Sequence, residues 1–204
     1  IIQVDAGDFH WDLIMTVQWV KFPTQDLIID ETDPDITEAN SQAAYDQYNA
    51  TIPPLWQTYD SEKHWEGSFM RPVSNERSTE YGMRRFTNGR TNSRFHAGQD
   101  IKGEEGTPVL APANGRVIYA DYLLNTGYTI VIEHGGGLQT LYYHMSAIDV
   151  AAGDVVEQGQ PIGAIGSTGY STGPHLHFDV RIAGISIDPE LIHSGTGGLM
   201  YFEK

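Results

Sequence analysis

The chain has no cysteine and no long hydrophobic run, and each absence excludes a class of protein. Without cysteine, the 204 residues contain no disulfide framework, no thiolate metal site and no cysteine nucleophile. No stretch approaches the roughly 20 consecutive apolar residues that a membrane-spanning helix needs. We therefore expect no direct membrane insertion of this chain. Its 22 glycines and 10 prolines favour an architecture of short strands and many turns.

Positive charge is also scarce, and its distribution divides the chain. The formal net charge of -15 argues against nucleic acid or an anionic membrane as a partner. Residues 1–64 carry 12 acidic and 2 basic side chains, against 15 and 10 in residues 65–204. We predict an acidic accessory segment over 1–64, a main domain over 65–193 and a tail over 194–204. Because the chain starts at Ile1, we expect an upstream targeting segment to be missing.

The accessory segment is expected to be partly helical. Its stretch "DFHWDLIMTVQWVKF" fits both a helical stripe and strand alternation, and we favour a helix capped by Asp8. A second helix is predicted over roughly 37–50. Asp35 or Thr37 would cap it, and it would end before Pro53 and Pro54. Neither stretch carries recognisable chemistry.

From residue 65 onward, short β-like runs alternate with glycine turns. Asn114-Gly115 lies between two apolar runs and predicts a hairpin there. A second hairpin is predicted around the turn at 135–137, and further short strands over 153–169 and 175–184. The main domain is therefore predicted to be mainly β, as an antiparallel sheet, a sandwich or a partly open barrel.

Two histidines inside "STGPHLHFDV" are the first candidates for a site. In a strand, His175 and His177 share one face and lie roughly 6.5–7 Å apart along the chain. Zn–N bonds are about 2.0–2.1 Å long, so a straight strand does not easily give both imidazoles to one metal. One ligand and one catalytic group is the more natural division. The alternative is a pair of surface histidines on a solvated strand face.

A second pair, His96 and Asp100 in "RFHAGQD", supplies the other candidate ligands. Gly98 makes a helix improbable here, but a bent strand would also bring the two side chains together. Such a pair is more often structural than functional. Two imidazoles and one carboxylate are nevertheless the three-ligand set of a catalytic zinc whose fourth position is open to water. Asp179, beyond the H-x-H strand, either orients an imidazole or, as we favour, lies on a solvated face.

Taken together, these motifs resemble the lysostaphin/LytM-type zinc endopeptidases of bacterial peptidoglycan. The resemblance rests on "HAGQD", "GTPVLAPANGRV", "GYTIVIEHGGGLQTLYYHMS", "VVEQGQPIGAIGSTGYSTGPHLHF" and the closing "IDP". It runs from about Trp65 to Leu191 and implies an antiparallel β-sheet with an open groove over its face. It leaves residues 1–64 unexplained.

The resemblance assigns roles to five residues. His96, Asp100 and His177 would bind Zn²⁺, and His144 and His175 would be the catalytic pair. From the residues alone, His144 merely ends an apolar strand, where a histidine is usually capped or exposed.

Three features depart from the family pattern or fall outside it. Gln99 stands where the family more often has an aliphatic residue, which we expect to affect packing rather than the metal. Tyr81 is a candidate for an assisting tyrosine, whereas Tyr143 is expected to pack. Four arginines in the loop 77–95 either line a wall of the groove or are solvated charges: Arg84, Arg85, Arg90 and Arg94.

The implied function is zinc-dependent hydrolysis of peptidoglycan cross-links at glycyl-glycine or D-Ala–diamino-acid bonds. That function implies a bacterial cell-envelope or extracellular location. The main alternative is a catalytically silent family member that acts as a scaffold or activator of other wall hydrolases. A biotinyl or lipoyl carrier is excluded because no lysine lies between Lys102 and Lys204. A zinc-binding module without hydrolysis would leave His144 and His175 without a role.

Overall fold

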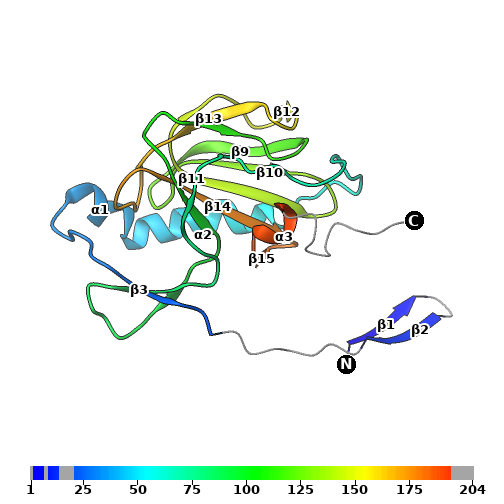
Figure 1. The fold of residues 1–204 in the computed structure, drawn as a ribbon, viewed down its shortest axis with the longest axis horizontal. Coiled ribbons are helices and arrows are strands. Elements are labelled where there is room, and N and C mark those ends of the chain that lie inside the picture. The colour runs from blue at the N-terminus through cyan, green and yellow to red at the C-terminus, as the bar shows by residue number, and fades with distance from the viewer. Residues whose placement is uncertain (1, 7–8, 14–20, 194–204) are drawn as a thin grey trace.

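A computed structural model describes residues 2–6, 9–13 and 21–193 (Figure 1). At the N-terminus, strand β1 (Ile2–Ala6) pairs antiparallel with β2 (Phe9–Leu13). The helix favoured over 8–22 is therefore wrong for residues 9–13, and residues 14–20 lie outside the described part. Short apolar stretches fit both periodicities, and here the available partner strand selects the extended form.

Ten strands form the main sheet, in which every pairing is antiparallel. Its central order is β12-β9-β10-β11-β14-β7-β4, while β13 joins β11 to β8 and β15 pairs with β14. The predicted antiparallel β class is confirmed. The strands are β4 (Arg77–Thr79), β7 (Gln99–Lys102), β8 (Pro108–Leu110), β9 (Gly115–Leu123), β10 (Gly127–Glu133), β11 (Leu138–Ile148), β12 (Val155–Val156), β13 (Pro161–Ile165), β14 (His175–Ile182) and β15 (Ile185–Ile187).

One of the two predicted hairpins is confirmed and the other is wrong. β10 and β11 pair through the turn at 135–137, as expected. Across Asn114-Gly115, however, β8 pairs with β13, whereas β9 pairs with β10 and β12. Gly115 does not have the positive φ that a tight hairpin turn needs. A Cβ at Gly115 would lie 2.6 Å from Ile132, so this glycine permits close packing instead.

A second, three-stranded sheet consists of β3 (Thr24–Leu27), β5 (Arg84–Thr87) and β6 (Arg94–Phe95). β3 and β5 run parallel, with Gln25 opposite Arg85, and β6 is antiparallel to β5. Residues from the acidic segment thus form a sheet with the loop that precedes the H-x-x-x-D motif.

The single helix predicted over 37–50 is two helices, α1 (Pro34–Ala39) and α2 (Gln42–Leu55). Asp33 caps α1, and the Ser41 side chain accepts from the Ala44 amide to start α2. α2 also continues through Pro53 and Pro54. The two prolines lie in its last turn, whose carbonyls accept the following amides at i+3. A short third helix, α3 (Glu190–His193), follows the last strand.

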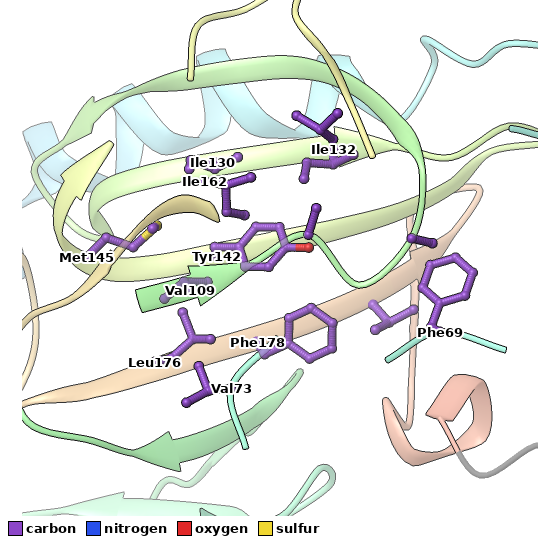
Figure 2. Packing of buried hydrophobic residues seen from close by; sticks show 14 of the residues in the cluster. Phe69, Val73, Val109, Ile130, Ile132, Tyr142, Met145, Ile162, Leu176 and Phe178 are labelled. Carbon is purple, nitrogen blue, oxygen red and sulfur yellow. The ribbon is translucent and has the colours of Figure 1, made fainter. Parts of the chain in front are cut away.

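Hydrophobic residues cover both faces of the main sheet. Along β10, Ile130 and Ile132 point into the larger core cluster (Figure 2). Val131, between them, belongs to the cluster on the opposite face. On that opposite face Val131 packs with the fully buried Ile52 of α2. Residues of the acidic segment are thus part of the core beneath α2, and the boundary near residue 64 stays a prediction. In the described ranges, no helix combines the length and apolarity needed to cross a bilayer.

Candidate active site

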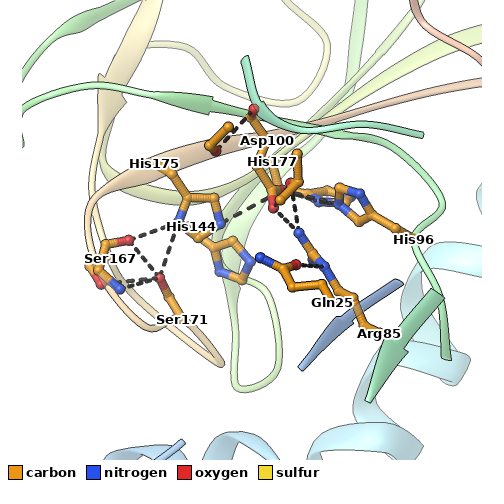
Figure 3. Close-up of polar contacts among 12 residues, drawn as sticks. Gln25, Arg85, His96, Asp100, His144, Ser167, Ser171, His175 and His177 are labelled. Carbon is orange, nitrogen blue, oxygen red and sulfur yellow. Dashed lines mark hydrogen bonds and ion pairs between the residues drawn. The ribbon is translucent and has the colours of Figure 1, made fainter. Parts of the chain in front are cut away.

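Strands β7 and β14 bring two of the predicted ligands side by side. In their antiparallel register, Asp100 lies directly opposite His177, so both side chains leave the same face of the sheet. His96 reaches the same point from the bend between β6 and β7. All three residues are buried, and Figure 3 shows them converging.

The three donor atoms lie at the spacing that one metal ion requires. His96 Nε2 is 3.1 Å from Asp100 Oδ1, and His177 Nδ1 is 2.9 Å from the same oxygen. The two imidazole nitrogens are 3.0 Å apart. Bonds of about 2.0–2.1 Å to a tetrahedral zinc would place such ligand atoms roughly 3.3 Å from one another. The donor set therefore fits Zn²⁺ with little movement.

The hydrogen bond made by His96 Nδ1 also supports metal binding through His96 Nε2. Its Nδ1 is 2.8 Å from the Glu80 carbonyl, so Nδ1 carries the proton and Nε2 presents a lone pair. That lone pair faces the Asp100 oxygen, and two acceptors at this distance repel unless a cation lies between them. Burial lowers the pKa of His177 to about 4, which keeps this imidazole neutral and able to bind a metal. Burial by itself raises the pKa of Asp100, but the hydrogen bond from His177 lowers it well below its ordinary value.

A β-bulge brings His144 to the site. Tyr128 pairs with Met145 but Ile130 pairs with Tyr142, so Tyr143 and His144 together oppose one residue of β10. Simple alternation would turn His144 into the main core, where Tyr142 and Met145 both lie. Instead His144 has a φ of 64°, a strained value that turns it to the site face.

His144 and His175 form a pair beside the three predicted ligands. Their ring centroids are 4.9 Å apart, and His175 Nε2 is 3.8 Å from Asp100 Oδ1. Both Nδ1 atoms face backbone carbonyls, Thr168 at 2.8 Å and Gly173 at 2.7 Å. In the neutral form of each ring, Nε2 is therefore the acceptor nitrogen. Burial, and then the neighbouring His175, lowers the pKa of His144 to about 3.

These residues open into a cavity of about 1080 Å³. Its lining includes His96, Asp100, His144 and His175, together with the loop 170–174. The expected groove is thus present at the site.

The four arginines of the loop 77–95 divide between the cavity and the surface. Arg85 and Arg94 line the cavity. Arg84 donates to the Ser93 hydroxyl, and Arg90 forms an exposed ion pair with Glu31.

Sequence reasoning missed the partners of the second Asp100 oxygen. Thr79 Oγ1 donates to Oδ2 at 2.5 Å, and Arg85 forms an ion pair with the same oxygen. Gln25 in turn accepts from Arg85 Nε at 3.1 Å. No motif marks Thr79 or Gln25, and the sequence predicts Arg85 only at a groove wall or as a solvated charge.

Two expectations about neighbouring residues can be compared with the structure. Tyr81 does not line the cavity, and its hydroxyl donates to the Ser186 carbonyl. Tyr143 is buried and stacks on the His177 ring, with centroids 5.2 Å apart.

The solvated position favoured for Asp179 is wrong. The residue is fully buried and pairs with Arg181 at 2.8 Å. Burial raises the pKa of Asp179 to about 6. Because odd-numbered residues of β14 share the face of His177, Asp179 lies on a face that α2 and its neighbours cover.

Gly98, between His96 and Asp100, allows the bend to lie against β14. A Cβ at this position would be 2.3 Å from the Phe178 carbonyl oxygen. We expect Gly98→Ala to lower the free energy of unfolding by about 1–3 kcal/mol and to weaken zinc binding, because both flanking ligands must shift. Urea unfolding of the metal-free proteins measures the first effect, with Ala97→Ser as the control. A Gly98→Ala variant as stable as the control would contradict this reading.

The sequence profile described as "Peptidase family M23" matches residues 94–189. A DD-carboxypeptidase/endopeptidase, Mpg, of Neisseria meningitidis is 40% identical over 111 residues, which cover 54% of this chain and 26% of Mpg. The murein hydrolase activator EnvC of Escherichia coli is 45% identical over 94 residues, covering 46% of this chain and 22% of EnvC. The matched region thus spans about a quarter of each relative.

Among solved structures, that of the antimicrobial peptidase lysostaphin from Staphylococcus simulans is similar, with a TM-score of 0.54 and 30% sequence identity. The similarity covers 65% of this chain and 56% of the lysostaphin chain. The sheet architecture expected from the sequence is confirmed by this likeness.

Proposed function

Because the chain belongs to peptidase family M23, of the lysostaphin/LytM type, we propose that it is a zinc-dependent endopeptidase of bacterial peptidoglycan. The family and a relative named as an endopeptidase support a hydrolase. The observation that carries the proposal is the convergence of His96 Nε2, Asp100 Oδ1 and His177 Nδ1 beside two imidazoles whose Nδ1 atoms both face backbone carbonyls. A site that only bound a metal would have no use for that pair.

In this proposal His96, Asp100 and His177 hold the ion. A bound zinc would act as a Lewis acid that polarises the scissile carbonyl and activates a water molecule. One anionic ligand leaves such a centre with a net charge of about +1. The remaining chemistry belongs to side chains of this chain.

His144 and His175 move the protons. The Thr168 and Gly173 carbonyls hold each Nδ1–H, so each Nε2 is aimed at the cavity as an acceptor. One of the two takes the proton of the attacking water. The pair holds this one proton as an imidazolium, which stabilises the tetrahedral oxyanion and then passes the same proton to the leaving amine. No glutamate is needed as a base.

An open cavity suits a short, flexible cross-linking peptide better than a deep pocket does. Glycyl-glycine and D-Ala–diamino-acid bonds are both proposed substrates. A substrate in the wall places the protein in the bacterial cell envelope or outside the cell.

The second candidate function is activation of another wall hydrolase without hydrolysis by this chain. The similarity to EnvC favours it. Loss of a ligand or of a catalytic histidine would be the mark of a silent member, and all five residues are present here. We therefore favour the enzyme.

The test is incubation of the zinc-loaded protein with purified walls of different bridge chemistry. Mass spectrometry should find new amino ends on glycine or on the diamino acid, and chelated protein should produce none. Intact walls after treatment with fully zinc-loaded protein would contradict the proposal. Stimulation of a second hydrolase under the same conditions would favour the activator.

A further inference from the structure

We propose that Arg85, held in place by Gln25, is a positioning residue that restricts Asp100 to binding the metal through one oxygen. This inference rests on the proposed metal site but not on hydrolysis. Its basis is that the two oxygens of Asp100 have separate sets of partners. Oδ1 faces the two ligand imidazoles, whereas Oδ2 faces Thr79 and Arg85.

The contacts of Oδ2 fix the rotation of the carboxylate. Thr79 Oγ1 donates to Oδ2 at 2.5 Å, and Arg85 Nη2 contacts both Oδ2 and, at 2.7 Å, Thr79 Oγ1. The Asp100 side chain is 7% exposed and that of Arg85 is 19% exposed, so water competes weakly for these contacts. With Oδ2 occupied, only Oδ1 is available to a metal. Hydrogen bonds of this kind orient ligands and commonly change metal affinity by about 10–100-fold.

Gln25 extends this contact into the acidic N-terminal segment. In the parallel pairing of β3 and β5, Gln25 lies opposite Arg85, and its Oε1 accepts from Arg85 Nε at 3.1 Å. Because the guanidinium is planar, a hydrogen bond at Nε also fixes the direction of Nη2. Residues 25 and 85 both lie outside the matched residues 94–189. A strand beyond the family match therefore supports the metal centre.

Arg84 provides a matched control. It is the neighbouring residue on β5, carries the same charge, and donates to Ser93 rather than to Asp100. Arg85→Met should weaken zinc binding about 10–100-fold in competition with a chromophoric chelator, whereas Arg84→Met should leave it unchanged. Arg85→Lys should recover part of the loss. A lysine keeps the charge but cannot contact Asp100 and Gln25 at the same time as the guanidinium does. Gln25→Ala should weaken binding in the same direction by a smaller factor.

Cobalt substitution gives a readout that general destabilisation would not produce. If the released carboxylate binds through both oxygens, the coordination number rises and the visible absorption of bound Co²⁺ weakens in Arg85→Met but not in Arg84→Met. Unchanged zinc affinity in Arg85→Met, or a gain, would overturn the proposal, because the guanidinium would then add only charge repulsion. Equal losses in both arginine variants would overturn it too.

These measurements depend neither on wall cleavage by the protein nor on the correct folding of the Arg85→Met variant. Zinc affinity is measured without any wall substrate, so a protein that binds zinc but cleaves no wall would refute the peptidase and leave this inference standing. If circular dichroism shows Arg85→Met to be unfolded, Gln25→Ala and Arg85→Lys decide. Wild-type affinity and spectra in both would reject the positioning role.

Discussion

Replacing His177 by alanine is expected to remove zinc binding and hydrolysis together. Its Nδ1 lies 2.9 Å from Asp100 Oδ1 and 3.0 Å from His96 Nε2, at the centre of the proposed ligand set. Structural zinc in zinc-finger peptides binds with about 10–16 kcal/mol, and on that scale loss of one of three protein ligands costs roughly 3–5 kcal/mol. That is a loss of about 10²–10⁴-fold in affinity. Chelator competition and a wall-digestion assay measure the two effects on the same preparation.

His64→Ala is the control for this experiment. His64 pairs with Asp60 and does not line the cavity, so its removal should leave zinc binding and turnover unchanged. Because His177 also stacks on Tyr143, circular dichroism should first show that the His177→Ala variant is folded. A folded His177→Ala protein with wild-type zinc affinity would show that the ligand set is wrong.

The second large effect is expected from replacing His175 or His144. Unlike the His177 variant, these variants should keep their zinc and lose most of their turnover. Neither Nε2 belongs to the three-atom cluster, so His175→Ala and His144→Ala should each retain zinc. Each should lose about 10²–10⁴-fold in kcat, the usual contribution of a positioned acid or base. Zinc content and kcat measured on one sample distinguish this result from loss of the metal.

The two histidines are expected to act as one unit. The double variant should therefore lose little more than the worse single variant, because groups that share one proton-transfer step do not add. His175→Ala with near wild-type turnover would refute its assigned role. Losses that multiply in the double variant would show that the two imidazoles act in separate steps.

The main sheet and the placement of His175 and His177 on one face follow from local patterns. Alternating apolar runs and the glycine turn at 135–137 predict β10 and β11, and the period of two places His175 and His177 on one face. Ligand roles come from the resemblance, and the structure brings ligand atoms of the same three residues within 4.8 Å of one another.

The parts that could not be predicted depend on long-range pairing or on strain. The bulge that turns His144 to the site is decided by how β10 and β11 pair, which alternation within β11 does not reveal. Asn114-Gly115 carries a hairpin signal, but the close approach of Ile132 explains the glycine instead.

The contact between Gln25 and Arg85 joins residues 60 positions apart through a parallel pairing. Such pairing leaves little local signal, because each strand is short and half exposed. Asp179 illustrates the same limit. Its burial depends on helix α2, which covers this face of β14. The residues around Asp179 in the sequence do not predict that the helix packs there.

Anomalous diffraction at the zinc edge, from crystals of the zinc-loaded full chain, tests the central claim most directly. The predicted result is one strong peak within about 2.0–2.2 Å of His96 Nε2, Asp100 Oδ1 and His177 Nδ1, with His144 and His175 near it but not bound. A peak held by His144 or His175 in place of any of these three, or no peak at this position, would contradict the account.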